Sequence, residues 1–184
     1  FLFLSFYLEN IIKIPMPFRG YLIGKSYWSG IGIVPIVLAG YLMYGIYVNL
    51  MAGIYIEKKT KYLPLITGIG AAVNVAVNFA LIPKFGMTGA AYATLVSYFA
   101  MMVGIYITSS KFYKIDYEFS KIYLIAFSTI ATFAIYSFTA GTVLHEWYFK
   151  FVYLVLFFVL IFAFKIVTLK DIKSLRGIKK APVT

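Results

Sequence analysis

Long apolar runs alternate with short polar links along most of this chain. An α-helix needs about 20 mostly apolar residues to cross the roughly 30 Å of hydrocarbon in a bilayer. Five runs have about that length, and the links between them are rich in Lys, Gly and Pro. The pattern predicts five full transmembrane helices, near residues 30–56, 62–82, 87–108, 122–143 and 151–167.

A shorter apolar run at the start predicts part of a sixth transmembrane helix, within residues 1–14. The first residue is Phe1 and not Met, and neither a basic segment nor a small-residue cleavage site indicates a signal peptide. We therefore expect a fragment that lacks its N-terminal part. Its expected organisation is a partial helix at 1–14, a membrane domain at 15–168 and a basic cytoplasmic tail at 169–184.

The composition favours an all-α, polytopic membrane protein. Hydrophobic residues make up 62% of the chain and charged residues 12%, whereas soluble domains contain about 25% charged residues. The chain has no Cys, so it offers neither a disulfide framework nor a thiolate site.

The net charge of +11 could indicate nucleic-acid binding, but the basic residues do not form one stripe with interleaved aromatic residues. They lie in the links between spans, and alternate links lie on opposite faces of a membrane. Of the 17 Lys and Arg, five fall in one set of alternate links and twelve in the other. The positive-inside rule places the richer set, and with it the C-terminus, in the cytoplasm.

Polar residues within the first full span form one pattern. Tyr41, Tyr44 and Tyr47 recur every third residue, and Asn49 follows two residues later, so several polar groups lie toward one side of the helix. They could line a hydrated cavity that binds a sugar or a head group, or they could pack against neighbouring helices. This span is also long enough to tilt or break, and Pro35 and Gly40 are the expected break points.

Asn74 and Asn78 lie four residues apart in the second full span, and hence on one helix face. Amides are costly in hydrocarbon, so we expect both to face protein or water. Hydrogen bonding between helices and contact with a substrate both explain them.

A helical hairpin is expected around residues 78–94. Pro83 is expected to stop one helix, and Gly86 to permit the tight turn into the next. Gly86 with Ala90, and Gly89 with Ala93, place small residues four apart, which is typical of closely packed membrane helices.

The motif N-x3-N-x3-I-P-K-F-G-x2-G-A-A-x-A-T at 74–94, preceded by I-Y-I-E-K-K-T-K at 54–61, resembles the C-terminal part of the polysaccharide flippase family. That family belongs to the multidrug/oligosaccharidyl-lipid/polysaccharide exporter (MATE-like) superfamily. The resemblance covers residues 27–121, roughly half of the chain, and the last two spans match only in hydropathy and spacing.

The resemblance implies a multi-pass protein of the bacterial inner membrane, with about fourteen helices in two pseudo-symmetric lobes that work by alternating access. This chain would be its last third, a fragment of the C-terminal lobe. The implied substrate is an undecaprenyl-pyrophosphate-linked oligosaccharide, and membrane lipids surround the protein. A glycan polymerase or glycosyltransferases could be protein partners, and no nucleic acid is expected.

The candidate substrate contacts combine one cation at a span end with polar residues inside the spans: Lys25, Tyr44, Asn49, Asn74, Asn78 and Tyr98. The 17 basic residues lie in links or near span ends, so a buried cationic cavity would come largely from another part of the transporter. No cofactor is expected.

The hypothesis that the chain is an enzyme finds little support in the sequence. His145-Glu146 opens like a zinc motif, but Phe149 stands where the second His is needed and no other His or Cys is present. Two further hypotheses remain open, a small-cation exporter and a non-transporting subunit of a glycan assembly complex. A cation exporter is expected to carry an acidic residue inside a span, and here the acidic residues lie at links or ends.

The tail after the last span repeats an apolar residue every third position, with Lys and Arg between. This predicts either a short amphipathic helix on anionic lipid or a basic tail that only fixes topology.

Overall fold

The computed structural model describes residues 1–17, 20–113, 118–139, 149–164 and 166. The chain divides into two compact units, essentially residues 3–116 and 117–184, and each is described by itself. The basic tail at 169–184 and the end of the fourth predicted span lie outside the described residues.

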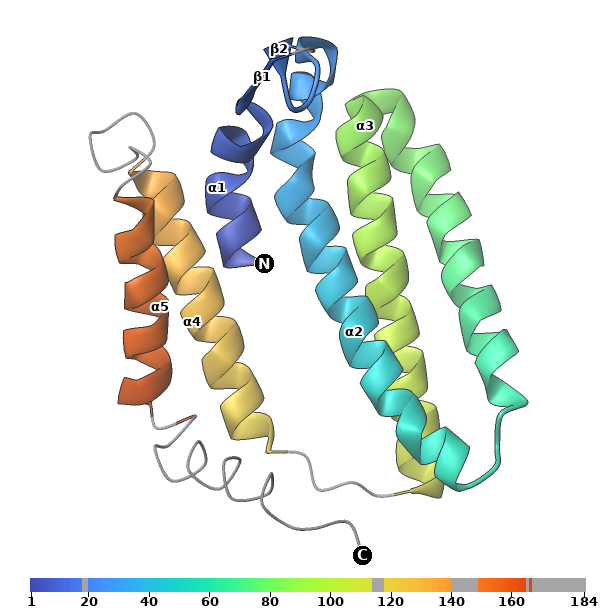
Figure 1. Ribbon diagram of the computed structural model, residues 1–184. Coiled ribbons are helices and arrows are strands. Elements are labelled where there is room, and N and C mark those ends of the chain that lie inside the picture. Colours follow the sequence, from blue (N-terminus) through green and yellow to red (C-terminus); the bar gives the residue numbers. More distant parts are fainter. Residues whose placement is uncertain (18–19, 114–117, 140–148, 165, 167–184) are drawn as a thin grey trace, which may run out of the picture. The chain divides into compact units, whose positions relative to one another are not determined.

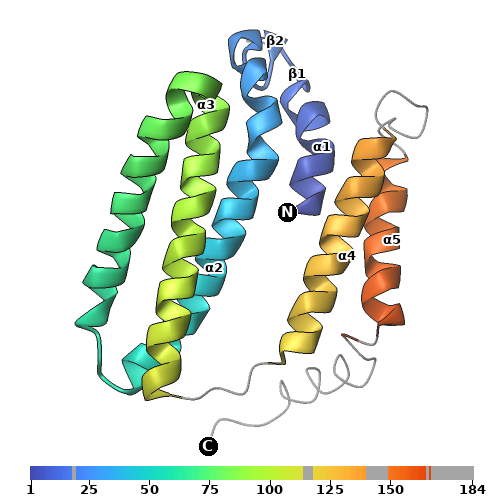
Figure 2. The same ribbon diagram turned by 180° about the vertical axis from the view of Figure 1, so that it is seen from behind.

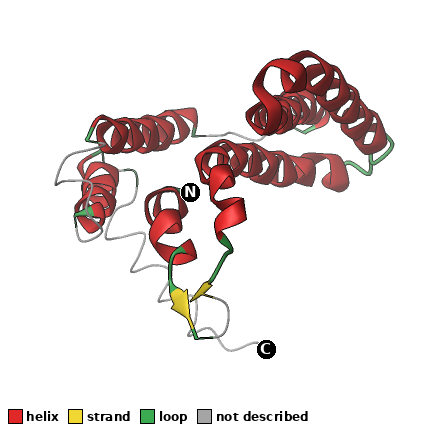
Figure 3. Cartoon of the chain, turned by 90° about the horizontal axis from the view of Figure 1, so that it is seen from above, coloured by secondary structure: helices red, strands yellow, loops and turns green. Residues whose placement is uncertain are grey.

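The first unit begins with a short helix and a small strand pair. Helix α1 is Leu2–Ile12, and strands β1 (Pro15–Met16) and β2 (Gly20–Tyr21) pair antiparallel (Figure 3). The backbone N–H of Leu22 donates to the Ile14 carbonyl, and that of Ile23 to the Ile12 carbonyl, which ties this strand pair to the end of α1. The apolar run at 1–14 did not predict the strands, because two-residue strands carry no recognisable periodicity.

A continuous helical run follows, but its first part is a tighter helix. The 3₁₀ segment η1 is Lys25–Ile33, and α2 is Val34–Ile56. Pro35 lies in the first turn of α2, where its missing N–H costs no hydrogen bond. Near Pro35, where a break was expected, the helix does not break but changes from 3₁₀ to α geometry between Ile33 and Val34. At Gly40, the other expected break point, α2 continues without interruption.

Helix α3, Tyr62–Phe112, is a hairpin of two helical halves, 62–85 and 87–112 (Figure 1). The backbone leaves helical geometry at Gly86, where φ is 53° and ψ is −129°. The Tyr62 and Phe112 rings lie 5.2 Å apart, and the Ser97 hydroxyl donates to the Gly70 carbonyl at 2.7 Å, so the halves run antiparallel. Pro83 lies inside the first half and does not end it, contrary to the expectation.

Helix α2 packs against both halves of α3. A Cβ on Gly40 would lie 3.4 Å from the Leu95 Cα, and one on Gly53 would collide with the Ser109 hydroxyl. Gly40 meets Leu95 and Gly53, further along α2, meets Ser109, further along α3. The two helical segments, α2 and the second half of α3, therefore run parallel, side by side in Figures 1 and 2. Ile54, Ala93 and Ile105 are fully buried and form the core of this unit.

The second unit contains helices α4 (Phe119–Phe138) and α5 (Lys150–Ala163). The Tyr136 and Tyr153 rings meet edge to face at 5.6 Å, and the Tyr153 hydroxyl donates to Thr139 Oγ1 at 2.8 Å. These contacts join the end of α4 to the start of α5, so the two helices form an antiparallel pair.

Three helical segments of the described chain are long and apolar enough to cross a membrane: Lys25–Ile56, Tyr62–Phe112 and Ser120–Phe138. This is the signature of a membrane protein. The prediction of five full spans is wrong in detail. Two of the predicted spans are the halves of α3, and the last, 151–167, corresponds to α5, which has only 14 residues.

Candidate functional site

Three tyrosines gather where α2 meets the second half of α3. The Tyr98 ring lies 5.9 Å from that of Tyr41 and 5.1 Å from that of Tyr44. Tyr41 and Tyr44 follow one another by about one helical turn, and Gly40 lets the α2 backbone approach closely enough for Tyr98 to reach them. We call Tyr41, Tyr44 and Tyr98 the tyrosine cluster.

The tyrosine cluster is open on one side. Tyr41 is 57% exposed and Tyr44 is 39% exposed, although both lie well inside an apolar helix. A tyrosine combines an apolar ring with a hydroxyl that needs a hydrogen-bond partner away from water. The cluster therefore presents aromatic faces and hydroxyl groups together on the surface of the first unit.

Tyr47 has a different environment from the two tyrosines before it. Its ring stacks on Tyr44 at 5.8 Å, but Tyr47 is only 4% exposed and its hydroxyl lies 3.4 Å from Thr67 Oγ1. Tyr47 thus packs between α2 and the first half of α3, as one of the two interpretations expected. The sequence could not identify Thr67 as its neighbour, because the partner depends on how the helices pack.

The remaining candidates of the first helical run do not join the tyrosine cluster. Asn49 is exposed, and its amide donates to the Gly45 carbonyl of its own helix at 2.9 Å. Lys25 is the first residue of η1, well before Tyr41 in the sequence. Its ammonium lies 5.4 Å from the centre of the Tyr21 ring. The structure therefore brings together Tyr44 and Tyr98 but neither Asn49 nor Lys25.

Asn74 and Asn78 bond to each other along one helix face. The Asn78 amide donates to Asn74 Oδ1 at 2.9 Å, and both side chains are half-buried. The Asn78 Oδ1 atom is buried and has no hydrogen-bond partner. An unsatisfied buried carbonyl costs about 1–3 kcal/mol, so this oxygen is a place where a donor from water or another molecule would be stabilised.

The small residues after the α3 turn permit close contact between the two halves. A Cβ on Gly89 would lie 2.6 Å from the Leu81 carbonyl oxygen, and Ala93 is fully buried. Ala90, which lies between them in the sequence, is half-buried. These residues, with Gly86 and Pro83, shape the hairpin.

Metal chemistry has no ligand set in the part of the chain that the structure describes. No group of three or more His, Cys, Asp or Glu side chains lies close enough there to hold a metal ion. His145 and Glu146 lie outside the described residues.

Comparisons with known proteins gave no match at any level. No protein-family model matches the chain, and neither a curated protein nor a solved structure matches it. The assignment therefore stands at the class that the helices define, a helical membrane protein.

Proposed function

We propose that the chain is the C-terminal part of a flippase that moves an undecaprenyl-pyrophosphate-linked glycan across the bacterial inner membrane by alternating access. The proposal rests on the resemblance of residues 74–94 to the polysaccharide flippase family and on the tyrosine cluster. The protein acts as a transporter and not as an enzyme, with its C-terminus in the cytoplasm.

The tyrosine cluster is the observation that favours a glycan as cargo. Sugar rings have apolar C–H faces and polar hydroxyl edges, and tyrosine offers an apolar ring face beside a hydroxyl. In the proposed mechanism the glycan passes along α2 and the second half of α3, where Tyr41, Tyr44 and Tyr98 replace part of its hydration shell.

The asparagine pair supplies a second contact in this proposal. Asn78 Oδ1 is buried and lacks a donor, so a glycan hydroxyl or a water molecule that reaches it gains a hydrogen bond. The pyrophosphate needs cationic or amide donors, and the described lysines lie at helix ends. Cationic groups within the path come from the other part of the transporter.

A complementation experiment in the full-length gene tests the proposal. Deleting the gene is expected to leave lipid-linked glycan on the cytoplasmic leaflet, and the wild-type gene to restore periplasmic glycan. Tyr44→Ala is expected to lower the rate of restoration about two- to tenfold, the value of one aromatic contact, whereas Tyr44→Phe keeps most of it.

The matched control is Tyr92→Ala, because Tyr92 is also exposed on α3, at 45%, but lies outside the tyrosine cluster. Periplasmic glycan that is unchanged by the deletion would contradict the flippase function. Equal losses in Tyr44→Ala and Tyr92→Ala would contradict only the role of the cluster.

A further inference from the structure

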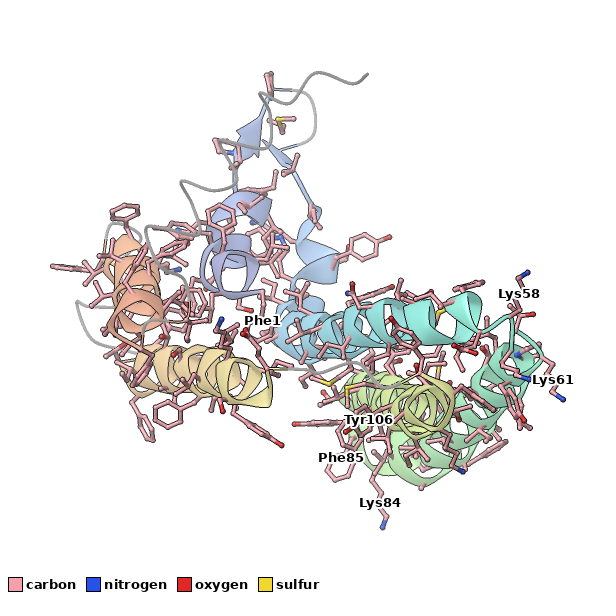
Figure 4. All side chains as sticks on the ribbon, turned by 90° about the horizontal axis from the view of Figure 1, so that it is seen from below. Phe1, Lys58, Lys61, Lys84, Phe85 and Tyr106 are labelled. Atoms are coloured by element: carbon pink, nitrogen blue, oxygen red, sulfur yellow. The ribbon has the colours of Figure 1, made fainter. Side chains whose placement is uncertain are left out.

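The turn between α2 and α3 carries three lysines, and the end of α3 brings a fourth to it. Lys58, Lys59 and Lys61 are exposed in the turn, and the Lys59 ammonium lies 5.7 Å from the centre of the Phe112 ring, next to Lys111. We call Lys58, Lys59, Lys61 and Lys111 the lysine cluster. Lys58 and Lys61 point away from the helices in Figure 4.

The backbone at Lys58 adopts a conformation that usually requires Gly. Its φ is 53°, the one positive φ of a non-glycine residue in the described chain. The N–H of Lys59 donates to the Ile54 carbonyl at 2.9 Å and that of Lys58 to the Tyr55 carbonyl at 3.1 Å. These two bonds form a Schellman motif, in which Gly is the usual residue at the position of Lys58. A lysine at this position makes the folded protein less stable than a glycine would, and such strained positions are typical of functional sites.

Within the described part of the chain, no carboxylate pairs with the lysine cluster. Lys13 pairs with Glu9 and Lys121 with Glu118, but none of the four clustered lysines lies within 4.0 Å of a described carboxylate, although Glu57 is adjacent in sequence. Aromatic rings hold two of the ammonium groups, because Lys61 also lies 5.5 Å from the centre of the Tyr62 ring. Four cations are therefore concentrated at one end of the unit, with no ion pair to a carboxylate among the residues that the structure describes.

Apolar side chains border the lysine cluster on the α2 side. Tyr55 is 55% exposed and Ile56 is 57% exposed, directly before the turn. Both α2 and α3 are apolar helices that could span a membrane. A molecule with an anionic head and apolar chains fits this border better than a soluble anion, because its chains cover the exposed side chains while its head meets the lysines.

We propose that the lysine cluster binds the phosphate head group of an anionic phospholipid, and that Lys58 occupies its glycine-type position for this contact. The inference does not depend on the flippase proposal, since it uses the charges and geometry of the turn alone.

The experiment places the full chain in phosphatidylcholine vesicles and measures its association with spin-labelled phosphatidylglycerol against spin-labelled phosphatidylcholine. Lys58→Gly is expected to weaken the preference for phosphatidylglycerol about fivefold, the contribution of one basic residue near an anionic surface. The same variant is expected to unfold at an equal or higher temperature, because Gly suits the positive φ. This combination separates loss of binding from loss of fold.

The variant Lys58→Gly/Lys59→Gln/Lys61→Gln, which keeps Lys111, is expected to weaken the preference well beyond Lys58→Gly alone, and Lys84→Gln, at the turn within α3, to keep it. An unchanged preference in the triple variant, or an equal loss in Lys84→Gln, would overturn the proposal. Inorganic phosphate, compared with chloride at equal ionic strength, is expected not to displace the labelled lipid. Displacement would assign the cluster to a soluble phosphate and overturn the lipid assignment.

Discussion

At the scale of single residues, glycines set how closely the helices of the first unit approach. A Cβ on Gly53 would collide with the Ser109 hydroxyl, one on Gly70 with the Met101 side chain, and one on Gly89 with the backbone at Leu81. Without a hydrophobic driving force between helices in lipid, such close approach and a few hydrogen bonds supply the stability. The consequence of adding a methyl group therefore depends on whether the neighbour can move.

Gly89→Ala is expected to destabilise the protein by about 1–3 kcal/mol, the usual cost of overpacking, because its neighbour is backbone and cannot rotate away. Gly68→Ala in the same helix is the matched control, since a Cβ there meets nothing within 4 Å. Thermal unfolding in detergent, followed by circular dichroism, measures both. Equal stability of the two variants would contradict the packing described here.

Gly53→Ala is expected to destabilise by a similar amount, and here the neighbour can be removed. The Ser109 hydroxyl is buried without a partner, so Ser109→Ala alone is expected to be nearly neutral. The double variant is expected to recover most of the stability that Gly53→Ala loses. Additive effects of the two substitutions, measured in the same unfolding assay, would show that they are not in contact.

Some contacts between helices could be predicted from the sequence, and others could not. The spacing of Gly89 and Ala93 predicts close packing, and a Cβ on Gly89 would lie 2.6 Å from the Leu81 carbonyl oxygen in the preceding half of α3. The grouping of Tyr44 with Tyr98 could not be predicted, because it depends on Gly40 meeting Leu95 across the two helices. Contacts between helices depend on register, which a single sequence does not encode in any local pattern.

At the scale of elements, the two halves of α3 were predicted as spans 62–82 and 87–108 but run to residues 85 and 112. The first half is longer than predicted because the helix tolerates Pro83 and ends at Gly86. Proline is accepted in membrane helices when neighbouring groups satisfy the freed carbonyl. Hydropathy does not predict the short strands β1 and β2. It also predicts a last span that extends to residue 167, whereas α5 ends at Ala163.

The position of the turn gives a prediction at this scale. Gly86→Ala is expected to cost about 1–3 kcal/mol, because residues with side chains rarely adopt its positive φ. Pro83→Ala is expected to leave stability unchanged or to raise it, since it restores a backbone donor inside the helix. A larger loss in Pro83→Ala than in Gly86→Ala, measured by chemical denaturation, would mean that the proline makes the turn.

At the scale of the whole molecule, apolar helices account for most of the described chain and charged groups lie at their ends. Lys58, Lys59 and Lys61 follow α2, and Lys84 lies beside the turn within α3. Hydropathy predicted apolar helices with charged residues between them, because the apolar runs and the charged links can both be read from the sequence. The face of the membrane on which each end lies remains a prediction from the positive-inside rule.

Cysteine accessibility tests the central claim most directly, and the absence of native Cys makes single substitutions clean. Thr60→Cys and Met87→Cys place one thiol in the turn after α2 and one beside the turn in α3, both in exposed positions. In intact cells a membrane-impermeant thiol reagent is expected to label Met87→Cys, and to label Thr60→Cys only after permeabilisation. Labelling of both from the same side would contradict a first half of α3 that crosses the membrane.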